Sequence, residues 1–209
     1  RDKKEAIIKK DTIIVGISSK KVDVDKSYNK MREYGKYNPD LYVYNINKPK
    51  ELLKNNKNKY IIGSSKDNVA LIVKLNNNEI VDLDEKVSLY INNTWLNNNK
   101  DKIIKLVKNH YTILSNENEY IKKIAGQNNG YCYLEQKDKD ILSVCNKNDD
   151  YTILPSIIIK DNSLLNLEQN LKPGVIIGTN INNYKNVIRY IKTKGYNIVS
   201  IEELLSEDL

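Results

Sequence analysis

The sequence predicts an α/β fold with a mainly parallel sheet and helices packed outside it. Short apolar runs alternate with amphipathic segments of about 10–14 residues, the pattern of strands joined by crossover helices. The chain has 209 residues, of which 40% are apolar, enough for one domain with a substantial core. This apolar content excludes a fully disordered protein, and a mean hydropathy of −0.60 excludes a membrane-embedded one.

The first sixty residues contain a strand, a helix and a second strand. Residues 12–17 are a continuous apolar run, which predicts a buried strand. A helical pattern begins at Asp23 and stops near Gly35. Residues 41–46 alternate as a strand does, and residues 47–60 are polar and basic, as expected of a connector.

From residue 61 onward, strands and helices alternate regularly. We predict strands at 69–75, 87–91, 111–114, 131–134, 151–159, 175–177 and 196–201. Helices are predicted at 98–109, 116–125, 137–146, 163–171 and 181–194, with a final helical turn at 202–207. The Pro173-Gly174 pair separates a helix from the next strand, and Gly195 is a typical helix stop.

The net charge of +7 limits the classes of partner. A basic protein suits nucleic acid, an anionic membrane surface or an anionic cell-wall polymer. The lysines are scattered, and no arginine-rich stripe or aromatic RNA-binding motif accompanies them, so we expect solvated lysines and no nucleic-acid partner. The abundance of Asn, Lys and Ile indicates an AT-rich genome rather than a function.

The two cysteines, Cys132 and Cys145, are too few for a disulfide scaffold and wrongly spaced for a zinc knuckle. They fall on a predicted strand and on the helix that returns over it, so the two thiols can come close. A disulfide would close a loop of about 14 residues and contribute about 3 kcal/mol. We expect two buried free thiols, with the disulfide as the alternative.

The last third of the chain carries the most specific motif. Residues 172–177 read Lys-Pro-Gly-Val-Ile-Ile, and residues 191–205 read Ile-Lys-Thr-Lys-Gly-Tyr-Asn-Ile-Val-Ser-Ile-Glu-Glu-Leu-Leu. This end resembles that of the polysaccharide deacetylase (NodB-homology) family. Residues 68–71 resemble the start of the family's first barrel strand, and residues 87–91 with Trp95 resemble its second strand and the tryptophan after it.

The first part of the chain resembles one branch of that family. Residues 16–35 are similar to the extension of sporulation-associated, deacetylase-like proteins, and Ile61-Ile62-Gly63 is similar to the lead-in to their barrel. The resemblance implies a deformed (β/α) barrel of fewer than eight strands over residues 61–209. It also implies an N-terminal α/β extension over residues 1–60.

The chemistry of that family needs residues that this chain lacks. The resemblance implies a metal held by Asp-His-His, an Asp base and a His acid, which together hydrolyse an N-acetyl group of a sugar. The metal activates water and polarises the carbonyl, while the acid protonates the leaving amine. Three histidines are needed, and the chain contains only His110.

The family's catalytic motifs are degenerate at each position. Its first motif falls on Ile72-Val73-Lys74-Leu75, where a lysine would repel a divalent cation. Its histidine pair falls near Ser115 or Asn116 and near Glu119 or Tyr120. The degenerate positions are Lys74, Ser115, Asn116, Glu119 and Thr179.

Two further sets of residues are candidates for a site. A rearranged metal site would use Asp82, Asp84 and His110, although we expect a solvated acidic loop and a histidine at a helix end. The aromatic residues Trp95, Tyr131 and Tyr133 are candidates for stacking on a sugar, although each also suits a core position.

We therefore expect a pseudoenzyme with no cofactor, retained as a glycan- or protein-binding module of the cell wall or spore. Its expected partners are peptidoglycan, an anionic wall polymer or a spore-assembly protein. The alternative is an active or residual metal-dependent carbohydrate N-deacetylase with a rearranged site. Because the chain begins with Arg1 rather than Met, we expect a removed upstream signal or anchor. An extracytoplasmic or membrane-anchored location in a spore-forming bacterium follows from the resemblance.

Overall fold

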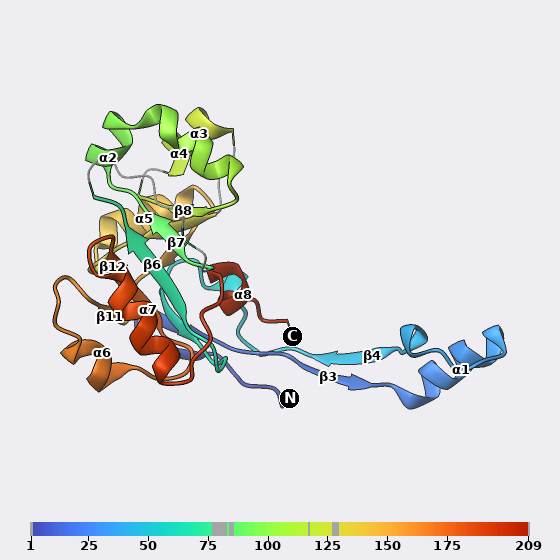
Figure 1. The fold of residues 1–209 in the computed structure, drawn as a ribbon. Helices are drawn as coiled ribbons and strands as arrows, with labels where there is room; N and C mark the ends of the chain where they lie inside the picture. The colour runs from blue at the N-terminus through green and yellow to red at the C-terminus, as the bar shows by residue number, and fades with distance from the viewer. Residues whose placement is uncertain (1, 77–82, 84–85, 117, 127–129, 209) are drawn as a thin grey trace.

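A computed structural model describes residues 2–76, 83, 86–116, 118–126 and 130–208 (Figure 1). The first sheet consists, in spatial order, of β1 (Ile7–Lys9), β2 (Thr12–Val15), β5 (Tyr60–Ser64), β10 (Tyr151–Ile153) and β9 (Tyr131–Tyr133). The second consists of β11 (Ile157–Ile158), β12 (Ile176–Asn180), β6 (Ala70–Lys74), β7 (Ser88–Tyr90) and β8 (Thr112–Leu114). Neighbouring strands are parallel except β1 and β2, which confirms the predicted α/β fold.

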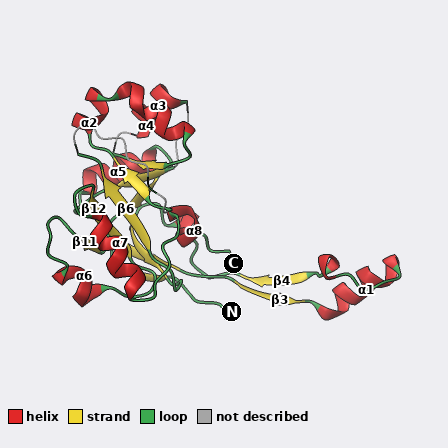
Figure 2. Cartoon of the chain, in the orientation of Figure 1, coloured by secondary structure: helices red, strands yellow, loops and turns green. Residues whose placement is uncertain are grey.

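Helices cover the outside of the sheets, as Figure 2 shows. They are α2 (Asn93–Asn98), α3 (Lys100–Lys108), α4 (Asn118–Ala125), α5 (Lys139–Lys147), α6 (Leu165–Asn170) and α7 (Tyr184–Thr193). One more helix, α8 (Ile201–Leu205), packs against the core between the sheets. Helix α7 is typical, because it buries Val187 and Ile191 while its polar residues face outward. The predicted helix over 98–109 is confirmed as α3. Helix α2 was not predicted; Asn92 caps it by accepting a hydrogen bond from Trp95 N at 2.8 Å.

Strand β6 separates two hydrophobic cores. Its side chains alternate between two faces, so Leu71 and Val73 pack with the outer helices. Ala70 and Ile72 pack between the two sheets. A strand buried on both faces must be apolar almost throughout. By the same alternation, Lys74 extends from the end of β6 on the side of the inter-sheet core.

Helix α8 lies at the opposite end of the inter-sheet core from Lys74. It buries Ile201, Leu204 and Leu205 in that core. Ser200 begins the helix, because its hydroxyl accepts a hydrogen bond from Glu203 N at 3.1 Å. The predicted strand over 196–201 is therefore wrong: the described pairing there is one isolated bridge, Val69 to Ile198.

The predicted strand over 151–159 is two strands in two different sheets. β10 belongs to the first sheet and β11 to the second, and Pro155 lies between them. Proline has no N–H to donate to a strand ladder, so pairing stops there. The chain passes from one sheet to the other at this residue.

A long arm projects from the body of the protein (Figure 1). It spans residues 19–47 and consists of the antiparallel strands β3 (Ser19–Val22) and β4 (Tyr44–Asn47), with α1 (Val24–Tyr34) and a short 3-10 helix, η1 (Pro39–Leu41), between them. The predicted helix start and stop are confirmed, because Asp23 caps the first turn and Gly35 ends the helix at φ 68°. Several apolar side chains of the arm face solvent, including Val24, which is 71% exposed.

We predict that the arm contributes little to the stability of the body. Replacing residues 20–46 with an Asn-Gly turn joins Ser19 to Asn47, which are partners in the strand register. Because an exposed two-stranded ribbon buries little apolar surface, the melting temperature should change by less than about 3 °C. Thermal unfolding followed by circular dichroism measures it. A much larger loss would mean that the arm packs on the body in solution.

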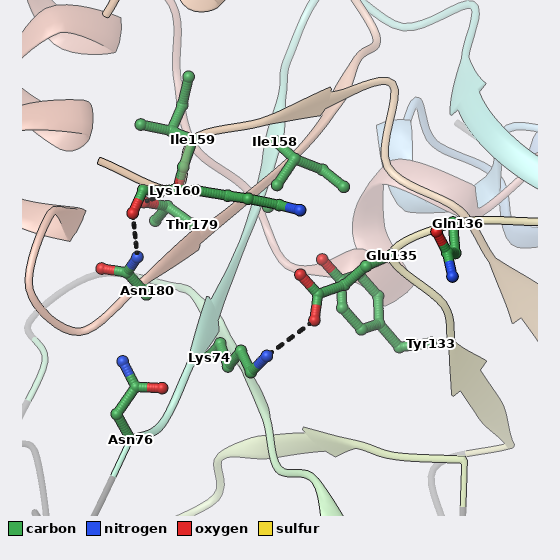
Figure 3. Close-up of a pocket in the computed structure, with 11 residues that line it drawn as sticks. Lys74, Asn76, Tyr133, Glu135, Gln136, Ile158, Ile159, Lys160, Thr179 and Asn180 are labelled. Atoms are coloured by element: carbon green, nitrogen blue, oxygen red, sulfur yellow. Dashed lines mark hydrogen bonds and ion pairs between the residues drawn. The ribbon is translucent and has the colours of Figure 1, made fainter. Parts of the chain in front are cut away.

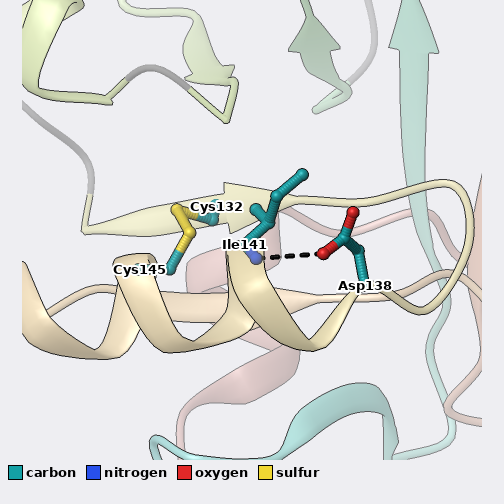
Figure 4. The surroundings of a disulfide bond; sticks show 4 residues. All are labelled: Cys132, Asp138, Ile141 and Cys145. Carbon is teal, nitrogen blue, oxygen red and sulfur yellow. Dashed lines mark hydrogen bonds between the residues drawn. A yellow bond between two sulfur atoms is a disulfide. The ribbon is translucent and has the colours of Figure 1, made fainter.

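The cysteines form a disulfide, which corrects the expectation of two free thiols. Cys132 in β9 and Cys145 in α5 are bonded, with their Cα atoms 6.3 Å apart (Figure 4). Helix α5 begins at Asp138, whose carboxylate accepts a hydrogen bond from Ile141 N at 3.1 Å. This cap turns the chain back over β9, so the two side chains meet in the buried layer between strand and helix.

Candidate functional site

A cavity of about 460 Å³ lies at the carboxyl ends of four parallel strands, where α/β folds commonly bind ligands (Figure 3). The strands are β6, β9, β11 and β12. Its lining residues are Lys74, Asn76, Tyr133, Glu135, Gln136, Ile158, Ile159, Lys160, Gly178, Thr179 and Asn180.

An ion pair crosses this cavity. The ammonium of Lys74 lies 2.9 Å from a carboxylate oxygen of Glu135 and 5.7 Å from the centre of the Tyr90 ring. Both charged side chains are about 30% exposed, at 31% and 29%, so the pair is partly shielded from water. Lys74 therefore carries its positive charge into the cavity and is held there by Glu135.

Tyr133 forms the floor of the cavity. Its ring lies 4.5 Å from that of Tyr90, and its side chain is almost fully buried. Burial raises the pKa of the Tyr133 phenol far above its usual value, so the hydroxyl stays protonated. A Cβ atom at Gly178 would lie 2.4 Å from this hydroxyl, so glycine is what allows Tyr133 to approach β12.

The opposite wall is built by the ends of β11 and β12. The hydroxyl of Thr179 donates to Ile159 O at 3.2 Å, and the amide of Asn180 donates to Lys160 O at 3.1 Å. These bonds hold the segment after β11 against β12. The exposed side chain of Lys160 extends from this wall toward the Tyr133–Glu135 side of the cavity (Figure 3).

The described lining residues do not fit a divalent metal ion. They offer one carboxylate, that of Glu135, and it is already paired with an ammonium group. No histidine is among them, and the described residues contain no group of three or more His, Cys, Asp or Glu side chains that could hold a metal. The predicted metal residues Asp82 and Asp84 lie outside the described part of the chain.

The structure brings together only part of the predicted site. Lys74 and Thr179 line the same cavity from adjacent strands. Asn116 and Glu119 line a different cavity of about 410 Å³ beside the disulfide, and Ser115 is fully buried after β8. His110 is exposed at the end of α3 with φ 64°, as expected of a helix-end residue.

The three predicted stacking residues lie in three different places. Tyr133 lines the cavity at the strand ends. Trp95 lines an asparagine-rich cavity of about 510 Å³ and is only 3% exposed. Tyr131 lines a third cavity, of about 320 Å³, beside α8 at the other end of the strands. The structure thus offers no shared aromatic platform from these three residues.

Sequence reasoning missed Glu135 and Lys160, which are the two charged residues besides Lys74 among the described residues that line the cavity. Each lies two residues beyond the end of a strand, β9 and β11 respectively. That position is a usable signal, because the residues that follow parallel strands gather at one edge of a sheet.

The described helices include none that is long and apolar enough to span a membrane.

Comparisons with known proteins identify the fold. No family model and no curated protein matches the sequence. The structure matches a CE4 family pseudoenzyme from Bacillus anthracis with a TM-score of 0.69 and 17% identity, covering 99% of this chain and 90% of that one. A mutant of that pseudoenzyme with restored enzymatic activity matches with a TM-score of 0.70.

Two further structures match a smaller share of this chain. PdaA of Bacillus subtilis, a family 4 carbohydrate esterase, has a TM-score of 0.54 and 14% identity, covering 70% of this chain and 83% of that one. A peptidoglycan N-acetylglucosamine deacetylase has a TM-score of 0.51 and 14% identity, covering 69% and 92%. The chain therefore has a mixed α/β fold like that of CE4 family carbohydrate esterases, which confirms the resemblance to polysaccharide deacetylases.

Proposed function

We propose that this chain is a catalytically inactive deacetylase-like protein that binds a glycan, or a protein partner, at the cell wall or spore. The observation that carries the proposal is Lys74, whose ammonium group occupies the end of β6 inside the cavity and pairs with Glu135. A deacetylase needs a carboxylate there to hold a metal or to take a proton. A fixed positive charge opposes both roles.

The acid–base groups of the chain also support the proposal that it is catalytically inactive. Sugar deacetylation needs an activated water and a separate acid that protonates the leaving amine. The chain has one histidine, His110, and it is not among the residues that line the cavity. Tyr133 is kept protonated by burial, so it does not replace a base.

We further propose that the two sheets are the two halves of a deformed (β/α) barrel. Strands β8 and β9, from different sheets, lie side by side. An isolated bridge joins Gly63 at the end of β5 to Val175 before β12. These contacts support a barrel whose carboxyl end carries the cavity.

An extracytoplasmic location is part of the proposal. The Cys132–Cys145 disulfide supports it, because disulfides persist in oxidising compartments. The fold match to a peptidoglycan deacetylase supports a wall glycan as the ligand. The spore-assembly partner and an upstream anchor rest on the sequence resemblance alone.

The proposal predicts neither metal binding at the cavity nor deacetylase activity. Zinc, cobalt and manganese titrated by calorimetry into chelator-stripped protein at pH 7 should bind no tighter than about 1 mM. Release of acetate from N-acetylated chitooligosaccharides should not exceed the blank with any of these metals present.

A stoichiometric micromolar metal site with acetate release would overturn the proposal. It would favour the alternative, a metal-dependent N-deacetylase with a rearranged site. The residues to replace next would then be Asp82, Asp84 and His110. Micromolar binding without acetate release would contradict the claim about the metal but not the claim about catalysis.

A further inference from the structure

We propose that the cavity binds an anionic group of a glycan, a carboxylate or a phosphate, between the ammonium groups of Lys74 and Lys160. This inference deepens the proposed function and rests on its claim that the cavity holds a glycan. The ligand class is set by charge: the described lining residues include two lysines and one glutamate, which leaves one excess positive charge among them.

Lys160 supplies that excess charge. Lys74 is neutralised by Glu135, whereas the ammonium of Lys160 makes no ion pair or hydrogen bond with any residue that the structure describes. Asn180 and Asn183 instead hold the backbone of this residue, through hydrogen bonds to its carbonyl oxygen at 3.1 and 3.4 Å. The backbone is therefore fixed, while the charged end is available to a ligand.

The remaining lining residues suit the neutral part of a sugar. Asn76 and Gln136 present side-chain amides, which can both donate to and accept from hydroxyl groups. Ile158, which is half-buried, adds an apolar surface beside them. A volume of about 460 Å³ is within the range of small-molecule sites and accommodates one or two sugar rings.

The inference reverses the ligand preference expected of a deacetylase groove. A metal site attracts the neutral acetamido carbonyl, whereas an unpaired ammonium attracts an anion. Two sources of such an anion exist in a cell wall: the lactyl carboxylate of a muramyl sugar and the phosphate of a glycerol-phosphate polymer. The shared chemistry is a negatively charged oxygen on a hydroxylated chain.

The test compares probes that differ in one charged group. N-acetylmuramic acid and N-acetylglucosamine differ only in the lactyl ether, and short glycerol-phosphate oligomers represent the second source. Dissociation constants are measured by NMR titration at low and high salt. We expect the anionic probes to bind and the neutral sugar to bind about tenfold more weakly, with the difference shrinking at high salt.

The matched variants are Lys160→Gln and Lys172→Gln. Both remove one exposed lysine charge, but Lys172 does not line the cavity. We expect Lys160→Gln to weaken the anionic probes about tenfold and leave N-acetylglucosamine unchanged. Lys172→Gln should change neither. Because Lys160 forms no ion pair with a described residue, its replacement should not disturb folding.

The outcomes separate this inference from the proposed function. Equal binding of neutral and anionic sugars, unaffected by Lys160→Gln, overturns the inference and leaves a glycan-binding pseudoenzyme. No binding of either anionic probe also overturns it. Deacetylation of N-acetylglucosamine oligomers would overturn the proposed function itself. A response to only one anionic probe identifies the source.

Discussion

Replacing Gly174 with alanine is expected to lower the free energy of unfolding by about 4 kcal/mol or more, which is most of the stability of a marginally stable protein. Gly174 has φ 82°, a conformation that costs an L-residue about 1–2 kcal/mol. A Cβ atom there would also lie 1.7 Å from the backbone oxygen of Ser64. Since backbone atoms cannot turn away as a flexible side chain can, the strands themselves must separate.

The separation would break the contact between the two sheets. Ser64 ends β5 in the first sheet, and its N–H donates to Gly174 O at 2.9 Å. The N–H of Gly174 donates to Asn68 O at 2.8 Å, just before β6 in the second sheet. This glycine therefore joins the two sheets below the cavity.

Gly195→Ala is the matched control. Gly195 has φ 84°, but a Cβ atom there meets nothing within 4 Å. The Gly195→Ala variant should lose only about 1–2 kcal/mol of stability, which is the cost of this backbone conformation for an L-residue. Its melting temperature should therefore be lower by about 2–8 °C. Urea unfolding followed by circular dichroism measures both variants. Equal losses in the two would contradict the role of the backbone contact.

Most of the second sheet could be predicted from the sequence because its strands are signalled locally. β6 is apolar up to Val73, a second apolar run marks β7, and a helical pattern separates β7 from β8. Strands β1, β3 and β5 were missed for a different reason. β1 and β3 are short and mostly exposed, so no apolar pattern marks them. β5 follows a polar connector and pairs with strands that are distant in sequence.

The two wrong strands each contained a readable signal. Pro155 stands inside the run 151–159, where a ladder donor is missing. Ser200 stands three residues before Glu203, the spacing of a capping box at a helix start. In both places the apolar pattern predicts a strand, whereas a single residue, Pro155 or Ser200, changes the direction of the backbone.

Only those residues of the candidate site whose position follows from a single strand could be predicted from the sequence. Lys74 is placed by the alternation of β6 alone. Its partner Glu135 is 61 residues away in sequence, so their meeting depends on how β9 and β6 are arranged in space. No local pattern predicts that arrangement. The position of Lys160 at the cavity likewise cannot be predicted locally, because it depends on the pairing of β11 with β12.

Removing the disulfide is expected to lower the free energy of unfolding by about 3 kcal/mol, because the bond closes a loop between residues 13 apart and so restricts the unfolded chain. The double variant Cys132→Ala/Cys145→Ala should therefore melt about 6–12 °C below the wild type. Both sulfur-bearing side chains are buried, so alanine avoids placing an unpaired polar group between β9 and α5.

Reduction separates the effect of the bond from the effect of lost side-chain volume. Wild-type protein in dithiothreitol should lose most of the same stability, while the double variant should not respond to reductant at all. If reductant left the wild-type melting temperature unchanged, the two thiols would be unbonded in solution, as we expect from the sequence alone. The bond joins β9 to the helix that follows Glu135, so a reduced protein should also hold the Lys74–Glu135 pair less firmly. Weaker binding of the anionic probes under reduction would then link the disulfide to the geometry of the cavity.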